Sequence, residues 1–264
     1  MSAAHVSEET VMEKNKSAGV FSEALWLAKK DIRRAWISYP ASGLFILALG
    51  LLVASSVDGV FVMEGFGESG RRAEGFFNAF FADYMFLIVG ALLAVNSLSM
   101  DYMRVWSDDV FSHRLAFLRS LPASTTSLVA SRAMSMLFAL PFTVPAFFLP
   151  MYFLSDLGEM GFSYVWFVGI WLGWSLLYAG ITLLCELAMS GKVYVWLSVA
   201  FIFGLIAILA FLEWTVELSL VGRSANLALE HGPLAATISL LAGGAAFALL
   251  ARETKKRVER RELS

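Results

Sequence analysis

Six apolar runs, each about 20 residues long and nearly free of charge, dominate this chain of 264 residues. An α-helix of about that length crosses the hydrocarbon core of a bilayer, because all its backbone polar groups are bonded within the helix. The chain is 58% hydrophobic and 16% charged, whereas soluble domains average about 25% charged residues. An all-α membrane protein is therefore predicted. Its six expected spans are Tyr39–Val57, Phe80–Met100, Ala133–Leu154, Phe162–Leu184, Val193–Leu212 and Pro233–Ala251.

The basic residues fall mostly on one side of these spans. With both termini in the cytosol, six lysines and arginines lie in the N-terminal segment, four after the second span, one after the fourth and six in the C-terminal segment. Only Arg71, Arg72 and Arg223 would lie outside. Because Lys and Arg concentrate in cytoplasmic loops, the sequence predicts six spans with both termini in the cytoplasm.

The spans form one domain, because no segment between them is long enough to hold a separate soluble core. Residues 1–18 are polar and predict a flexible cytosolic tail, and residues 19–252 form the transmembrane domain. Residues 253–264 are a charged cytosolic tail, in which Glu253 and Arg257 stand four apart on an extension of the last helix.

The segment before the first span, residues 21–36, has the pattern of an amphipathic helix. A basic amphipathic helix beside a span is typical of one that lies among the lipid headgroups. An ordinary solvated helix is the alternative. The apolar side would carry Phe21, Leu25, Ala28, Ile32 and Trp36.

A second amphipathic helix is predicted over Asp108–Arg119, in the basic loop between spans two and three. Pro122 follows it and should end it, since proline removes a helix hydrogen bond. Its apolar residues recur at the spacing of one helix face. They are Val110, Phe111, Leu115 and Leu118.

The sequence contains no recognisable pattern of catalytic residues. The three histidines lie in three different segments, Cys185 is the only cysteine, and no zinc-protease, serine-hydrolase or phosphate-binding motif is present. The chain is therefore predicted to be no enzyme, to hold no metal or cofactor and to bind no nucleic acid.

Two acidic residues lie near the ends of spans, where a transport pathway would first be sought. Asp83 is expected to lie at the membrane–water interface at the outer end of the second span, rather than to bind an ion. Glu186 is expected to pair with Lys192 or Arg132.

Small residues and prolines within the spans predict local packing and bends. Gly169 and Gly173 form a GxxxG pair, which fits either close packing inside one subunit or dimerisation. Three prolines, Pro141, Pro145 and Pro150, predict kinks in the third span.

The passage FLRSLPASTTSLVASRAMSML, residues 117–137, resembles the junction between coupling helix and third span in membrane subunits of ABC-2 type ATP-binding cassette transporters. The order of elements resembles this family over nearly the whole chain: an amphipathic helix, six spans, and a cytosolic helix between spans two and three. One departure is that Asp108 and Asp109 stand where many members carry glutamates.

The resemblance implies a permease of a bacterial cell membrane that exports a hydrophobic or amphipathic substrate such as a drug, peptide or lipid-like molecule. A separate ATPase subunit would bind ATP and Mg²⁺, and two permease subunits would form a homodimer or heterodimer. A haem-exporter-like permease, or a channel or sensor subunit without an ATPase, remains the alternative. The residues implied to contact the ATPase are Asp108, Asp109, Val110, Phe111, Arg114, Leu115, Leu118 and Arg119.

Overall fold

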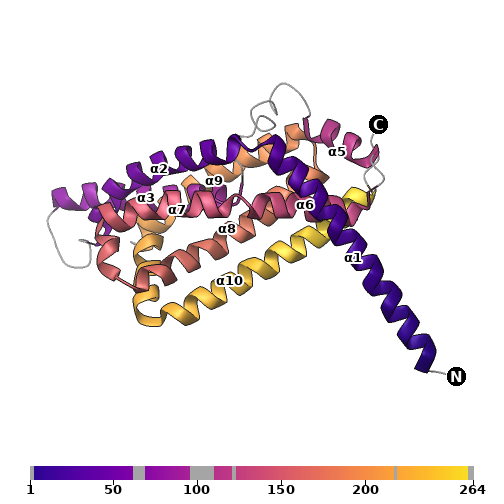
Figure 1. The fold of residues 1–264 in the computed structure, drawn as a ribbon. Helices are drawn as coiled ribbons and strands as arrows, with labels where there is room; N and C mark the ends of the chain where they lie inside the picture. The colour runs from indigo at the N-terminus through magenta and orange to yellow at the C-terminus, as the bar shows by residue number, and fades with distance from the viewer. Residues whose placement is uncertain (1–2, 62–68, 96–109, 121–122, 217–218, 261–264) are drawn as a thin grey trace.

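The computed structural model describes residues 3–61, 69–95, 110–120, 123–216 and 219–260, and these residues form helices joined by short turns, with no strand among them (Figure 1). The all-α prediction is confirmed. The helices are α1 (Ala3–Arg34), α2 (Ser38–Phe61), α3 (Ser69–Leu92), α5 (Val110–Ser120), α6 (Thr125–Leu137), α7 (Leu140–Leu154), the 3₁₀ helix η2 (Asp156–Met160), α8 (Ser163–Ala188), α9 (Gly191–Val216) and α10 (Leu220–Arg260).

Five helical segments in the described part of the chain are long and apolar enough to cross a membrane. They are Ser38–Val57, Thr125–Leu154, Ser163–Ala188, Gly191–Leu212 and Leu220–Arg260. The remaining predicted span, Phe80–Met100, falls on α3, where the apolar helix Ala79–Leu92 is shorter and residues 96–100 lie outside the described residues. The chain is thus an all-α protein with the helices of a membrane protein.

The third predicted span is broken between α6 and α7. Helix α6 ends at Leu137, and α7 begins at Leu140 with Pro141 in its first turn. Proline fits a first turn because its missing N–H has no helical acceptor there. The expected kink is therefore found at Pro141, while Pro145 and Pro150 lie inside α7.

At both ends of the chain the helices are longer than the segments predicted from the sequence. Helix α1 begins at Ala3, so residues expected as a loose tail continue the helix in the structure. The last span is part of a 41-residue helix, α10, which bends at His231 just before Pro233. Pro233 follows two residues later, and proline both lacks the N–H that would bond the preceding turn and crowds that turn, which accounts for a bend there.

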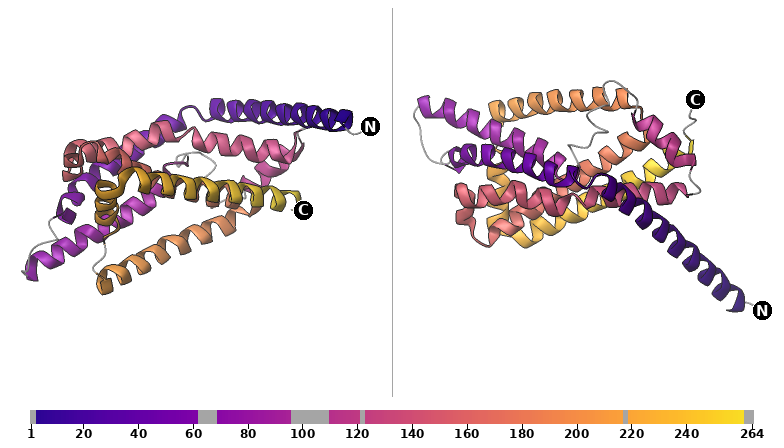
Figure 2. Two further views of the ribbon diagram at one scale, coloured as in Figure 1. Left: turned by 90° about the horizontal axis from the view of Figure 1, so that it is seen from below. Right: turned by 45° about the horizontal axis from the view of Figure 1, so that its top comes forward.

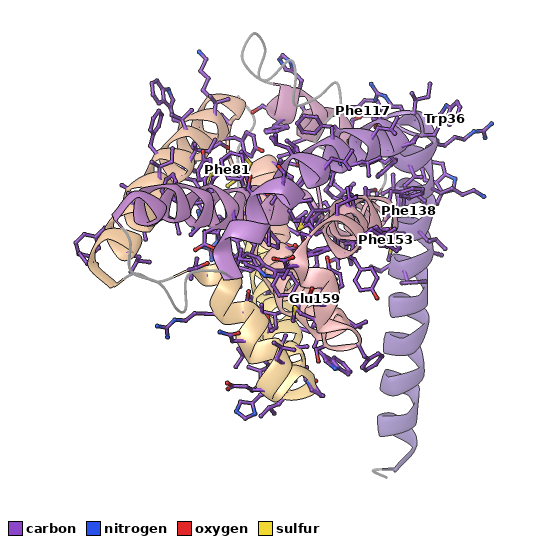
Figure 3. All side chains as sticks on the ribbon, turned by 90° about the vertical axis from the view of Figure 1, so that its left-hand side faces the viewer. Trp36, Phe81, Phe117, Phe138, Phe153 and Glu159 are labelled. Carbon is purple, nitrogen blue, oxygen red and sulfur yellow. The ribbon has the colours of Figure 1, made fainter. Side chains whose placement is uncertain are left out.

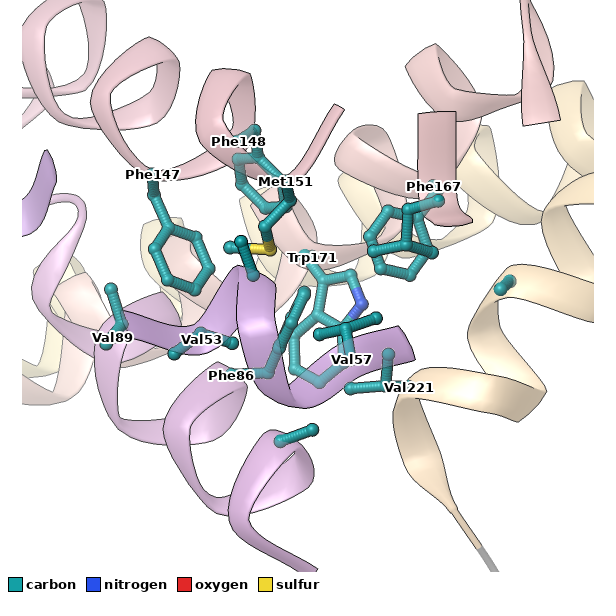
Figure 4. Packing of buried hydrophobic residues seen from close by; sticks show 14 of the residues in the cluster. Val53, Val57, Phe86, Val89, Phe147, Phe148, Met151, Phe167, Trp171 and Val221 are labelled. Carbon is teal, nitrogen blue, oxygen red and sulfur yellow. The ribbon is translucent and has the colours of Figure 1, made fainter. Parts of the chain in front are cut away.

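The main core lies where α2, α3, α7 and α8 meet, around the aromatic ring of Phe86 (Figure 4). Four aromatic rings surround it, with centroid distances between 4.9 and 6.2 Å. Edge and tilted contacts of this kind add to the energy of apolar burial. The four neighbours are Phe147, Phe148, Phe167 and Trp171.

Helices α8 and α10 pack closely enough to require glycine. A Cβ added at Gly173 would lie 2.3 Å from the Ser239 carbonyl oxygen, and one added at Gly243 would lie 2.1 Å from the Gly173 carbonyl oxygen. Ser239 Oγ donates a hydrogen bond of 2.7 Å to the Ile170 carbonyl across the same contact. Of the two uses expected for the GxxxG pair, the structure places Gly173 in packing within one chain.

The N-terminus, α5 and the C-terminus all lie toward one end of the helix bundle, and α1 points away from it (Figures 1 and 2). At the opposite end, η2 joins α7 to α8, and α9 leads toward α10 (Figure 1). The end that carries α5 is therefore where the sequence-predicted interface must be sought.

Candidate functional site: the α5 end of the bundle

Helix α5 covers Val110–Ser120, close to the predicted Asp108–Arg119, and it ends two residues before Pro122. Of the predicted interface residues, Asp108 and Asp109 lie outside the described residues. The backbones of Val110, Arg114, Leu118 and Arg119 belong to α5, but their side chains are not among those described. The position of the site therefore depends on Phe111 and Leu115.

Both residues face the chain's own helices. Phe111 is 3% exposed and Leu115 is 1% exposed. The Phe111 ring meets that of Tyr194 on α9 edge to face, with centroids 5.3 Å apart. Leu115 packs into a cluster with residues of α6, α8 and α10, which are Val129, Met136, Leu183, Leu187 and Val258. In the single chain both side chains hold α5 on the bundle, and the contact with a partner that the sequence analysis expected of them stays a prediction.

The outward side of α5 carries a different set of residues. His113, Ala116 and Ser120 are exposed, and Phe117 is 63% exposed. Figure 3 shows Phe117 among the labelled surface side chains. Aromatic residues are enriched in the contacts that contribute most to protein–protein binding, so this ring is a candidate contact. We call Phe117 and its exposed neighbours His113, Ala116 and Ser120 the outer face of α5.

A buried ion pair lies below α5, between α6 and α8. Arg132 donates from Nε to Glu186 Oε2 at 2.5 Å and from its terminal Nη2 to Oε1 at 2.9 Å. Arg132 is 12% exposed and Glu186 is 3% exposed. The two-pronged geometry suits the guanidinium group. Of the two partners predicted for Glu186, the structure pairs it with Arg132.

Helix α6 is tied to α1 as well as to α8. Ser124 caps α6 by accepting the Ser127 backbone N–H at 3.1 Å. Ser127 Oγ in turn donates to Glu23 Oε2 at 2.8 Å and to the Val20 carbonyl at 3.2 Å. Helix α6 is therefore held on both sides, by α1 and by α8.

The predicted interfacial helix, residues 21–36, lies on the last part of α1 and the turn after it, with Ala24, Leu27 and Ala28 turned inward. Ala24 and Ala28 are buried, and α1 packs along α6. Phe21 is 59% exposed, Leu25 53% and Trp36 65%, while Ile32 is partly buried. Large apolar side chains that stay exposed beside a membrane span are typical of a helix in contact with lipid.

Asp83 has a structural role at the opposite end of the bundle. Its carboxylate accepts hydrogen bonds from the backbone N–H groups of Leu220 and Val221, the second at 2.7 Å, and from Ser219 Oγ at 3.2 Å. It thus caps the first turn of α10 from a neighbouring helix, and the helix dipole favours negative charge there. Sequence spacing could not reveal this contact, and the position of Asp83 at the membrane–water interface stays a prediction.

No group of histidine, cysteine, aspartate or glutamate residues in the described part of the chain is arranged to hold a metal ion.

On the C-terminal part of α10, Arg257 Nε donates to Glu253 Oε1 at 3.0 Å. This confirms that the two residues four apart on the predicted charged helix interact.

The fold and this end of the bundle define an all-α membrane protein with a short docked helix outside its long apolar helices. Comparisons of the chain with protein families, with curated proteins and with solved structures gave no match.

Proposed function

We propose that this chain is the permease subunit of an ABC-2 type transporter in a bacterial cell membrane, powered by a separate ATPase subunit that docks on α5. The observation that carries the proposal is the double-sided character of α5. Its inner side is buried on the bundle through Phe111 and Leu115, while Phe117 on its outer face stays 63% exposed.

This arrangement suits a helix that receives a force and passes it on. A partner that moves the outer face of α5 would move Leu115, which belongs to one buried cluster with residues of α6, α8 and α10, and Phe111, whose ring meets that of Tyr194 on α9. Packed side chains transmit displacement well because protein interiors are dense and compress little. Energy from ATP on the partner would thereby reach helices in the membrane.

The topology that goes with this function has six spans and both termini in the cytoplasm. Two findings support it. The termini and α5 share one end of the bundle (Figure 1), and 17 of the 20 lysines and arginines fall on that side in the six-span arrangement. Helix α3 (Ser69–Leu92) would supply the second span.

Two copies of the chain, or this chain with a related one, would form the pathway for a hydrophobic or amphipathic substrate. Only 6% of the most apolar stretch of α9 is buried within the chain. A Cβ added at Gly204 on this helix would meet nothing within 4 Å. A second permease subunit could therefore approach α9 closely, since small residues permit close contact between helices in a bilayer. This chain would supply no catalysis itself; ATP and Mg²⁺ belong on the partner.

The test is co-purification of an ATPase subunit from cells that express the wild-type chain or either of two variants. Phe117→Asp places a charge on the outer face, where it would be desolvated against a partner without changing the buried side of α5. Phe117→Leu keeps an apolar contact and is the matched control. We expect Phe117→Asp to lose the ATPase and Phe117→Leu to retain it, both with the thermal stability of the wild type.

Retention of the ATPase by Phe117→Asp, with hydrolysis at the wild-type rate, would contradict the docking role of α5. Leu115→Asp does not provide this test, because Leu115 is 1% exposed and a charge there would damage the fold itself.

A further inference from the structure

An open apolar groove of about 390 Å³ lies along the outside of the contact between α2 and α7. Its floor consists of small residues: a Cβ added at Gly43 would lie 3.6 Å from the Phe142 carbonyl oxygen, so the two backbones nearly touch beneath it. Its walls are formed by larger apolar side chains, among them Leu44, Leu47 and Leu149.

The groove lies within two of the membrane-crossing segments, Ser38–Val57 and Thr125–Leu154. Leu44 is 67% exposed and Leu149 is 51% exposed. In water such a surface would favour aggregation, whereas in a bilayer a hydrocarbon chain can fill it. The shape and the apolar lining alone fit an acyl chain but do not select one lipid over another.

A preference for one class of lipid headgroup would come from the end of the groove next to Pro40. This residue follows the last residue of α1, Arg34, by six positions, and the Ser38 backbone N–H bonds the Ala35 carbonyl at 2.9 Å in the turn between the helices. Arg33 and Arg34 are both exposed. Both arginines are close to the groove mouth along the chain, since they precede Pro40 by seven and six positions.

The residues between these arginines and the groove are those of a membrane–water interface. Trp36 is 65% exposed and Ile37 is 63% exposed, and Figure 3 shows Trp36 at the surface. Tryptophan is enriched at the level of lipid headgroups, and basic residues beside a span attract anionic lipids. A phospholipid chain in the groove would thus place its phosphate in reach of Arg33 and Arg34.

We propose that the α2–α7 groove and the adjacent Arg33–Arg34 pair form a binding site for one anionic phospholipid. The acyl chain occupies the groove, and the phosphate-containing headgroup lies against the two guanidinium groups. The lipid would fix the angle between α1 and α2, because it contacts the end of one helix and the side of the other. This inference does not depend on the proposed function.

The test is native mass spectrometry of the full chain, released from detergent micelles with equal amounts of phosphatidylglycerol and phosphatidylcholine that carry identical acyl chains. The wild type is expected to retain the anionic lipid about tenfold more than the zwitterionic one. The double variant Arg33→Gln/Arg34→Gln should lose that preference. Arg252→Gln/Lys256→Gln, which removes two exposed charges from α10, should keep it.

A second variant tests the groove separately from the charges. Ala146→Phe fills the floor beside Gly43 and should reduce retention of both lipids severalfold, whereas Ala245→Phe on an exposed part of α10 should not. The proposal is overturned if the wild type shows no preference, or if the arginine variant keeps the preference. It is also overturned if Ala146→Phe changes only the proportion of dimer, because the groove would then be an interface between two copies.

Discussion

Removing one partner of the buried Arg132–Glu186 pair should destabilise the protein strongly. Glu186→Gln leaves the Arg132 guanidinium, 12% exposed, without its carboxylate. Breaking a buried ion pair in this way costs about 3–5 kcal/mol, because the remaining charge stays desolvated. For a chain of this size, a change of 1 kcal/mol shifts the melting temperature by about 2–4 °C, so a decrease of roughly 10 °C is expected.

The double variant Arg132→Met/Glu186→Leu distinguishes loss of charge pairing from general disruption. Replacing both charges with apolar groups of similar volume is often neutral or stabilising, so the double variant should melt near the wild-type temperature. Glu253→Gln is the matched control: it breaks a carboxylate–guanidinium pair with the same change, but both side chains are more than 40% exposed. Exposed pairs contribute little, and no measurable shift is expected.

The measurement is thermal unfolding of each detergent-purified variant, followed by near-ultraviolet circular dichroism. An unchanged melting temperature for Glu186→Gln would refute the view that this pair joins α6 to α8. A double variant no more stable than Glu186→Gln alone would show that the geometry of the pair, and not uncompensated charge, accounts for the loss.

Two further predictions follow from contacts between helices. Gly173→Val should prevent normal packing of α8 on α10 and sharply lower the yield of folded protein, because its Cβ would overlap the Ser239 backbone. Gly244→Val on α10, where an added Cβ meets nothing within 4 Å, should be tolerated, and equal yields would contradict the packing account. Asp83→Ala should lower the free energy of unfolding by about 1–3 kcal/mol, because the backbone N–H groups of Leu220 and Val221 lose their acceptor. Hydrogen exchange at these two residues should become faster, and Asp83→Asn should lose less stability. Unchanged exchange in Asp83→Ala would contradict the capping role.

Hydropathy was sufficient to predict most of the long apolar helices. The predicted run Tyr39–Val57 lies within α2, and Val193–Leu212 lies within α9. Such segments depend on local composition and on the need to bond every backbone group in lipid. The break at Pro141 was predictable for the same reason, since proline acts on its own turn of helix.

The contacts of the candidate site were less predictable, because an amphipathic pattern does not tell what its apolar face meets. The spacing of Phe111 and Leu115 correctly placed them on one face of α5, yet the structure turns that face toward α8 and α9. Phe117, the exposed aromatic residue of α5, differs from them in sequence only by its position on the helical wheel. Its importance could be recognised only once the buried side was known.

Long-range polar contacts were predictable only where few partners were available. Glu186 had two candidate cations near the same membrane edge, and one of them, Arg132, is its partner. Asp83 meets backbone N–H groups of residues more than 130 positions away. Backbone donors carry no signature in the sequence, so that contact required the fold.

The most direct test of the central claim is photo-crosslinking from the outer face of α5 in intact cells. A photoreactive phenylalanine derivative placed at position 117 should capture the partner ATPase, identified by mass spectrometry through its nucleotide-binding motifs. The same group placed at the buried position 111 should crosslink only within the chain, chiefly to α9. Capture of the ATPase at position 117 and not at position 111 is the result that the account predicts; no ATPase at position 117, in cells that contain both proteins, would contradict it.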